Sequence, residues 1–178
     1  MKTMRVRFTR SEYDLLPEGF PAQLVAGGLV KEPSPTYGHQ YVGNLLHARL
    51  AALVGLGRAL HAPQDVAIDE FNVYQPDVLV TREVPSFDAR DVGIPLLAIE
   101  VLSPSTARRD RNVKRRRLLD AGVEEVWIVD PAAQTVEVYD ASGRRAASGT
   151  ESIASRVVPG FDVVPSRLFA RPEGSPPS

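Results

Sequence analysis

Two carboxylates stand at positions where packing alone would not place them. Asp77 begins the apolar segment DVLVT directly after Pro76, and Glu100 lies inside the apolar segment IPLLAIEVL. A buried carboxylate is costly unless it is paired with a cation, hydrogen-bonded or bound to a metal. Strand alternation puts Glu100 on the same face as Leu102, so a partner is expected on that side of the sheet. Both acids are therefore candidates for chemistry.

A lysine in the basic segment that follows is the candidate partner. We expect a helix from about Thr106 to Ala121, and at about 100° per residue Lys114 falls on the apolar stripe of this helix. The other members of the stripe are Ala107, Leu118 and Ala121. An alternative is an ordinary surface pair between Asp110 and Lys114, four residues apart. A third interpretation makes Glu100 and Lys114 a structural ion pair with no catalytic role.

Asp77, Glu100 and Lys114 together are the parts needed for metal-dependent hydrolysis of phosphodiester bonds. Two carboxylates and a main-chain carbonyl can hold a hard cation such as Mg²⁺. The cation stabilises charge that develops on the phosphate, and a neighbouring ammonium orients or activates the attacking water. The chain has no cysteine, which excludes thiolate metal sites and thiol nucleophiles. Any metal must therefore be held by oxygen or imidazole.

These residues need a sheet with helices beside it to bring them together. We expect helices over 10–16, from the proline-rich link at 32–35 to about 55–57, and over 106–121, with a hairpin that turns at Gly27-Gly28. We expect strands over 65–68, 77–81, 94–102, 123–130 and 135–140, and weaker ones over 145–153 and 161–164. This order predicts a single α/β or α+β domain over residues 1–170 with a mixed sheet. A disordered tail is expected over 171–178.

The net charge of −1 conceals a division along the chain. Residues 108–117 hold seven basic residues and one acid, a charge of +6, whereas the other 168 residues hold 14 basic and 21 acidic residues, a charge of −7. A cationic helix of this kind is suited to the phosphates of a nucleic acid. No segment resembles a signal peptide or reaches membrane-spanning length, so we expect a cytoplasmic protein that contacts no membrane.

Four segments carry a resemblance to a known family: QPDVLV at 75–80, IPLLAIEVLSPST at 94–106, RDRNVK at 109–114 and AGVEEVWIVDP at 121–131. With them the chain resembles the bacterial Uma-two family of "putative restriction endonucleases", a branch of the PD-(D/E)XK nuclease superfamily. The resemblance implies a restriction-endonuclease-like mixed β-sheet flanked by α-helices. It also implies an endonuclease that uses Mg²⁺ (or Mn²⁺), takes DNA as its substrate and works as a homodimer.

The resemblance assigns roles to individual residues as well. It makes Asp77 and Glu100 metal ligands, with the Val101 carbonyl as a third ligand. The family's E-x-K pattern places its lysine where Leu102 stands here, so the catalytic lysine is expected on the following helix, at Lys114. The other departures lie where relatives carry acids or a tyrosine, at Gln23, Ala26 and Leu118.

Further residues are expected to contact the nucleic acid. They are the basic residues of the helix and a histidine at the start of the long helix, namely Arg108, Arg109, Arg111, Arg115 and His39. His39 matches a family histidine, and packing or hydrogen bonding at the helix start is an equal alternative for it. The lost upstream acids leave a second function open. In that alternative the chain is a catalytically impaired nuclease-fold protein that binds nucleic acid or another protein.

Overall fold

The computed structural model describes residues 7–31, 34–103 and 108–174, and at 108–111 it describes the backbone alone. The helices are α1 (Arg10–Tyr13), α2 (Tyr37–Val54), α3 (Arg108–Asp120) and α4 (Pro165–Leu168). The first strands are β1 (Ala22–Val25), β2 (Gly28–Lys31), β3 (Ala59–His61), β4 (Val66–Asp69), β5 (Asn72–Tyr74), β6 (Val78–Val80) and β7 (Leu97–Val101). The later strands are β8 (Glu125–Asp130), β9 (Thr135–Asp140), β10 (Gly143–Ser148), β11 (Ile153–Ala154) and β12 (Asp162–Val163).

The main sheet has six strands in the order β10-β9-β8-β7-β6-β3. Strands β7 and β8 are parallel and are joined by α3, and the other neighbours in this sheet are antiparallel. The predicted mixed sheet is therefore confirmed, and the basic helix α3 forms its crossover connection. A parallel pair requires such a crossover, because a tight turn cannot join two strands that run in the same direction.

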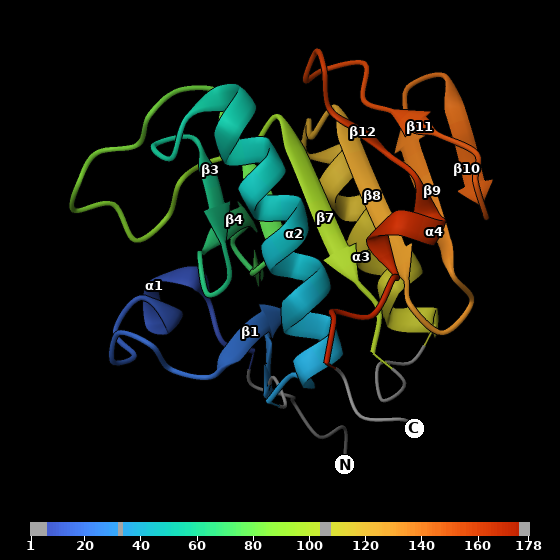
Figure 1. Cartoon of the computed structure of the whole chain (residues 1–178). Coiled ribbons are helices and arrows are strands. Elements are labelled where there is room, and N and C mark those ends of the chain that lie inside the picture. The colour runs from blue at the N-terminus through green and yellow to red at the C-terminus, as the bar shows by residue number, and fades with distance from the viewer. Residues whose placement is uncertain (1–6, 32–33, 104–107, 175–178) are drawn as a thin grey trace.

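Helices cover both faces of this sheet (Figure 1). The long helix α2 buries Val42, Leu46 and Leu50 against one face, where Trp127 and Ile99 lie fully buried. Each of these aliphatic side chains contributes about 1.5–3 kcal/mol to stability by leaving water. The basic helix α3 packs on the other face, over a smaller apolar cluster around Leu118. The apolar periodicity of both helices thus predicts which side each presents to the sheet.

A second, four-stranded sheet has the order β2-β1-β5-β4. The segment predicted at 65–68 is β4 of this sheet, and its neighbour β5 was not expected. Strands β3 and β5 are three residues long, too short for an alternating pattern to stand out. The predicted strand at 145–153 is divided into β10 and β11, and β12 covers part of the segment expected at 161–164.

Three predicted boundaries are wrong. The hairpin turns at Ala26-Gly27 rather than Gly27-Gly28, since Val25 pairs with Gly28 and the turn residues have φ of 51° and 78°. Asn72 Oδ1 accepts from the Ala26 N–H at 2.9 Å, which helps to hold this less favourable residue in the left-handed region. The first helix ends at Tyr13 instead of residue 16, and the central strand begins at Leu97 instead of 94. For the helix and for the strand, a nearby proline, Pro17 or Pro95, disfavours continuation.

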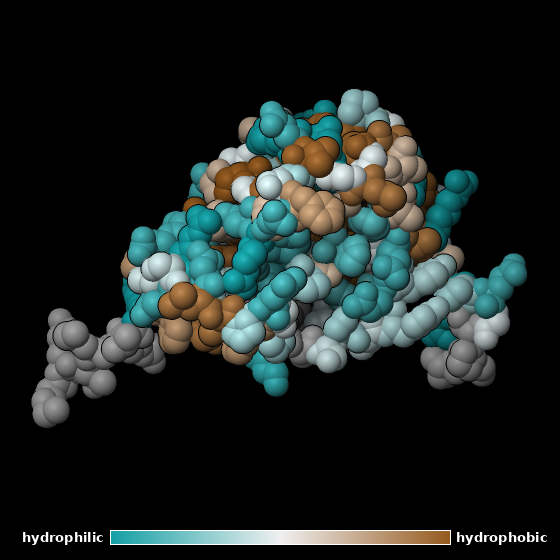
Figure 2. Space-filling view, turned by 90° about the vertical axis from the view of Figure 1, so that its left-hand side faces the viewer, coloured by the Kyte–Doolittle hydropathy of each residue, from teal (hydrophilic) through white to brown (hydrophobic). Residues whose placement is uncertain are grey.

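Figure 2 shows, on the side that carries α1, hydrophobic residues in separate patches among hydrophilic ones. Trp127 is fully buried, so it is a core residue and not a surface contact. The homodimer stays a prediction, as does disorder over 171–178, of which 175–178 lie outside the described residues. Within the described chain, no helix is long and apolar enough to cross a membrane.

Candidate active site

The two predicted carboxylates lie side by side at one end of the main sheet. Val78 pairs with Ile99 across β6 and β7, and one further step along this ladder sets Asp77 opposite Glu100. Side chains at directly opposed positions have their Cβ atoms about 4.5–5.5 Å apart. Asp77 and Glu100 are 24% and 15% exposed, so both are largely removed from water. Two carboxylates this close repel each other unless cations or hydrogen-bond donors compensate them.

The structure brings Lys114 to this pair from helix α3. Its Nζ lies 2.7 Å from Glu100 Oε1 and 3.3 Å from the Gln75 carbonyl oxygen, and its side chain is 16% exposed. The ammonium also lies 5.7 Å from the centre of the Tyr74 ring, within the range of a cation–π interaction. Lys114 therefore lies on the sheet-facing side of the helix, as its position on the apolar stripe predicts. The side chain of Asp110, the alternative partner, lies outside the described residues.

His39 completes the site from the first turn of α2. Thr36 caps this helix by accepting from the His39 N–H at 3.3 Å, and the His39 ring Nε2 lies 3.4 Å from Asp77 Oδ2. The hydrogen bond to Asp77 raises the pKa of His39 above its usual value. Burial opposes this shift, and the charge of Asp77 and a backbone hydrogen bond with Val101 add to it. His39 thus contacts a carboxylate of the site and its neighbouring main chain.

The oxygen atoms at this end of the sheet suit a hard cation. Asp77 Oδ2 accepts from the Val101 N–H at 2.7 Å and faces His39, whereas no described residue donates a hydrogen bond to Oδ1. Among the described residues, no three His, Cys, Asp or Glu side chains come together as a metal-binding group. A cation here would therefore use Asp77, Glu100, the Val101 carbonyl and water. Mg²⁺ in proteins often has such a ligand set, with few carboxylates and several retained waters.

The predicted phosphate-binding arginines can be placed only in part. The side chains of Arg108, Arg109 and Arg111 lie outside the described residues. The guanidinium of Arg115 is stacked over the Tyr139 ring, 3.7 Å from its centre. Arg115 therefore lies over β9, on the same side of the sheet as Lys114.

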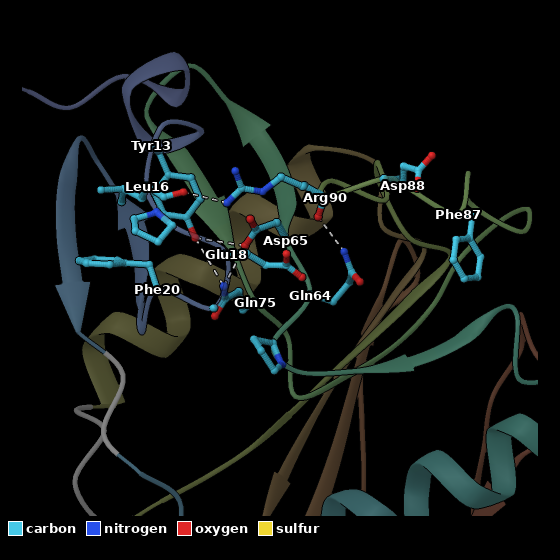
Figure 3. Close-up of a pocket in the computed structure, with 14 residues that line it drawn as sticks. Tyr13, Leu16, Glu18, Phe20, Gln64, Asp65, Gln75, Phe87, Asp88 and Arg90 are labelled. Atoms are coloured by element: carbon cyan, nitrogen blue, oxygen red, sulfur yellow. Dashed lines mark hydrogen bonds between the residues drawn. The ribbon is translucent and has the colours of Figure 1, made fainter.

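The sequence does not reveal a hydrogen-bonded network that holds the main-chain carbonyl to which Lys114 donates. The carbonyl belongs to Gln75, whose N–H donates to Gln23 Oε1 at 3.0 Å and whose Nε2 donates to Asp65 Oδ1 at 2.8 Å. The same Asp65 oxygen accepts from the hydroxyl of Tyr13, which is 4% exposed (Figure 3). These residues come from separate elements, so no spacing in the sequence could reveal them. Gln23, noted only because relatives have an acid there, lies within this network.

Gln75 also lines a cavity of about 560 Å³, whereas Asp77, Glu100 and Lys114 do not line it. Figure 3 shows Tyr13, Asp65 and Gln75 pointing toward one another within it, and Phe87 standing apart. Its wall carries the carboxylates of Glu18, Asp65 and Asp88 against one guanidinium, that of Arg90. Both terminal nitrogens of Arg90 already donate to main-chain carbonyls. This acid excess disfavours phosphate, so the cavity does not extend the candidate site.

Gln75→Met is expected to alter the surroundings of Lys114. The change removes the hydrogen bond to Asp65 and frees the loop that presents the carbonyl, at a cost of about 1 kcal/mol. The chain has three lysines, Lys2, Lys31 and Lys114, so the ¹³Cε signals of lysine can be resolved by NMR. We expect the Lys114 signal to move and the Lys31 signal to stay.

The matched control for this measurement is Gln64→Met. Gln64 lines the same cavity and donates to the Arg90 carbonyl at 2.7 Å, but it has no hydrogen bond to the site. An equal response of Lys114 to both changes would contradict a specific positioning role for Gln75.

Comparison with known proteins identifies the family of the chain and supports its fold. The model of the Uma2 family, described as "Putative restriction endonuclease", matches residues 10–166. The fold is similar to the crystal structure of a "putative nuclease belonging to DUF820" from Anabaena variabilis ATCC 29413. That similarity has a TM-score of 0.79 and 21% identity, and it covers 91% of this chain and 97% of that one. At this identity the likeness shows the fold alone, and no curated protein matches the chain.

Proposed function

Because the chain belongs to the Uma2 family of "putative restriction endonucleases", we propose that it is a metal-dependent endonuclease that hydrolyses phosphodiester bonds in DNA. The observation that carries the proposal is the convergence of Asp77, Glu100 and Lys114 at one end of the main sheet. The three come from β7, α3 and the residue before β6. The proposed class is PD-(D/E)XK, with the lysine supplied by the helix instead of the strand.

The proposed cofactor is Mg²⁺ or Mn²⁺. Asp77, Glu100 and the Val101 carbonyl would hold it, and when bound it supplies positive charge for the phosphate and lowers the pKa of a water. His39 and the Val101 N–H both bind Asp77 Oδ2, which orients the second oxygen of this carboxylate. Such contacts behind a ligand commonly fix its geometry and its affinity for the metal.

Lys114 would act on the attacking water. Its ammonium is fixed by Glu100 and by the Gln75 carbonyl, so one N–H remains for a water or a phosphate oxygen. Positioning of this kind in a partly dry site is worth more than the same contact in bulk water. The arginines of α3 would neutralise backbone phosphates, which adds affinity without sequence preference.

One observation favours the alternative of an impaired, binding-only protein. Gln23 uses its oxygen to hold the Gln75 N–H, a structural contact at a position where relatives carry an acid. A carboxylate there could otherwise contribute to a second metal site. We retain the single-metal endonuclease as the main proposal, because Asp77, Glu100 and Lys114 are all present.

The direct test is cleavage of plasmid and labelled linear DNA by the purified chain. We expect cleavage with Mg²⁺ or Mn²⁺, none with EDTA, and recovery when the metal is restored in excess. Calorimetric titration with Mn²⁺ measures binding independently of activity. Metal binding without cleavage would support the binding-only alternative for this substrate, and cleavage that persists in EDTA would contradict the proposed metal site.

A further inference from the structure

A hollow of about 330 Å³ lies on the face of the sheet that α3 covers, and one of its lining residues, Ile128, pairs with Glu100. Across the sheet, Glu100 pairs with Ile128 and Ile128 pairs with Glu137, so the three side chains form one row on that face. Ile128 and Glu137 both line the hollow. Leu102, two residues after Glu100 on the same strand face, lines it as well. The hollow therefore lies next to the candidate active site.

The walls combine apolar side chains with hydrogen-bonding groups. Leu102 and Ile128 provide the apolar part, and Thr135 and Asn112 provide a hydroxyl and an amide. Tyr139 closes the far side, with the Arg115 guanidinium stacked on its ring. Leu102 stands where the usual motif has a lysine, so the migration of the lysine to α3 leaves an apolar wall at this position. The volume is at the small end of the range for ligand sites.

The two carboxylates of the hollow already accept hydrogen bonds from the protein. Asp130 Oδ1 accepts from the N–H groups of Ala132 and Ala133, each at 3.0 Å. Glu137 accepts from the Tyr139 hydroxyl at 2.6 Å and pairs with Arg144. The hollow therefore suits a neutral planar group better than an anionic one, because both carboxylates keep their protein partners.

We propose that this hollow holds an unpaired nucleobase next to the phosphate that is cut, so that the substrate is single-stranded or locally unpaired DNA. The inference rests on the proposed function, since it takes Glu100 to mark the position of that phosphate. Proteins bind unpaired bases by stacking on apolar, aromatic and arginine surfaces and by hydrogen bonds from side-chain amides. A base within an intact duplex reaches such a pocket only after it has been unstacked and unpaired.

The test is binding of a fluorescein-labelled 12-nucleotide single strand and of the matching duplex, with Ca²⁺ replacing Mg²⁺. We expect the single strand to bind at least about tenfold more tightly than the duplex, the scale of one base stack. The double variant Asn112→Leu/Thr135→Val should lose about tenfold in affinity for the single strand, from two lost hydrogen bonds. Affinity for the duplex should be unchanged in this variant.

The matched control is Asn44→Leu/Thr150→Val, which makes the same two changes at exposed positions outside the hollow. It should bind both DNAs as the wild type does. A 2-aminopurine placed along the single strand should change its fluorescence on binding to the wild type and not to the pocket variant. Equal affinity for both DNAs, or equal loss in the pocket and control variants, would overturn the proposal. Binding is measured without cleavage, so the two proposals can fail separately. A chain that binds single strands more tightly but does not cleave DNA would contradict the proposed nuclease function and support the base pocket.

Discussion

Glu100→Gln is expected to reduce metal-dependent DNA cleavage by about 10³-fold or more. A metal ion contributes several kcal/mol to stabilising a phosphoryl transition state, and the amide that replaces Glu100 binds Mg²⁺ poorly. The side chains are nearly equal in size, so packing around β7 should not change. The measurement is the initial rate of cleavage at saturating Mn²⁺, with the exposed Glu151→Gln as a control for general charge effects.

The stability of the Glu100→Gln protein separates a catalytic site from a purely structural ion pair. If the pair with Lys114 existed only to hold the fold, its loss would leave an uncompensated ammonium and cost about 3–5 kcal/mol. We expect a smaller change in the metal-free protein, because the substitution also removes repulsion between Glu100 and Asp77. Mn²⁺ should raise the melting temperature of the wild type and leave that of the variant unchanged. Full cleavage by Glu100→Gln would refute the assignment of Glu100 as a metal ligand.

The charged members of the site could be predicted from sequence because each violates a local pattern. Glu100 interrupts an apolar strand, and Lys114 interrupts the apolar stripe of a helix that is otherwise basic. Such exceptions have a physical cost, so they point to a partner. The structure joins the two at 2.7 Å. Asp77 is a weaker exception, because it lies at the start of an apolar segment and carries little burial signal of its own, and the family resemblance strengthens its assignment.

The residues that hold the site could not be predicted in the same way. Gln75 and Tyr13 are ordinary polar and aromatic residues, and their importance arises from contacts across many residues of sequence. The short strand β5, which leads into Gln75, has no periodicity of its own and depends on pairing with β1 and β4. His39 is an intermediate case. The sequence is compatible with two roles for His39, a contact at the start of the helix or a contact with the substrate. In the structure its ring lies next to the carboxylate of Asp77.

The boundary errors share a cause with these omissions. Two adjacent glycines made Gly27-Gly28 the expected turn, yet Asn72 from β5 holds Ala26 in the left-handed region instead. A tertiary hydrogen bond thus outweighs a preference of about 1–2 kcal/mol for glycine at such a position. Local propensity predicted the hairpin, whereas its register depends on the second sheet.

Lys114→Met is expected to lower the rate of cleavage by about 10²–10⁴-fold, the range for loss of a group that manages protons or water. Binding of Mn²⁺, measured by calorimetry, should survive, since Asp77, Glu100 and the Val101 carbonyl are untouched. Lys114→Arg is the informative companion, because arginine can keep an ion pair with Glu100 but holds its donors in a different geometry. If the pair is only structural, the arginine variant should behave as the wild type. If the ammonium positions water, the arginine variant should still cleave DNA slowly.

A second lysine position allows the migrated lysine to be tested by gain of function. Leu102 lies two residues after Glu100 on the same face of the chain, about 6.8 Å along an extended strand, which a lysine side chain can span. We expect Leu102→Lys in the Lys114→Met background to restore part of the cleavage rate, and Leu102→Met in that background to restore none. Recovery would mean that the site needs an ammonium near Glu100 and not a particular helix to carry it. If Leu102→Lys restores stability but no activity, Lys114 serves the ion pair, and the catalytic role proposed for it must be abandoned.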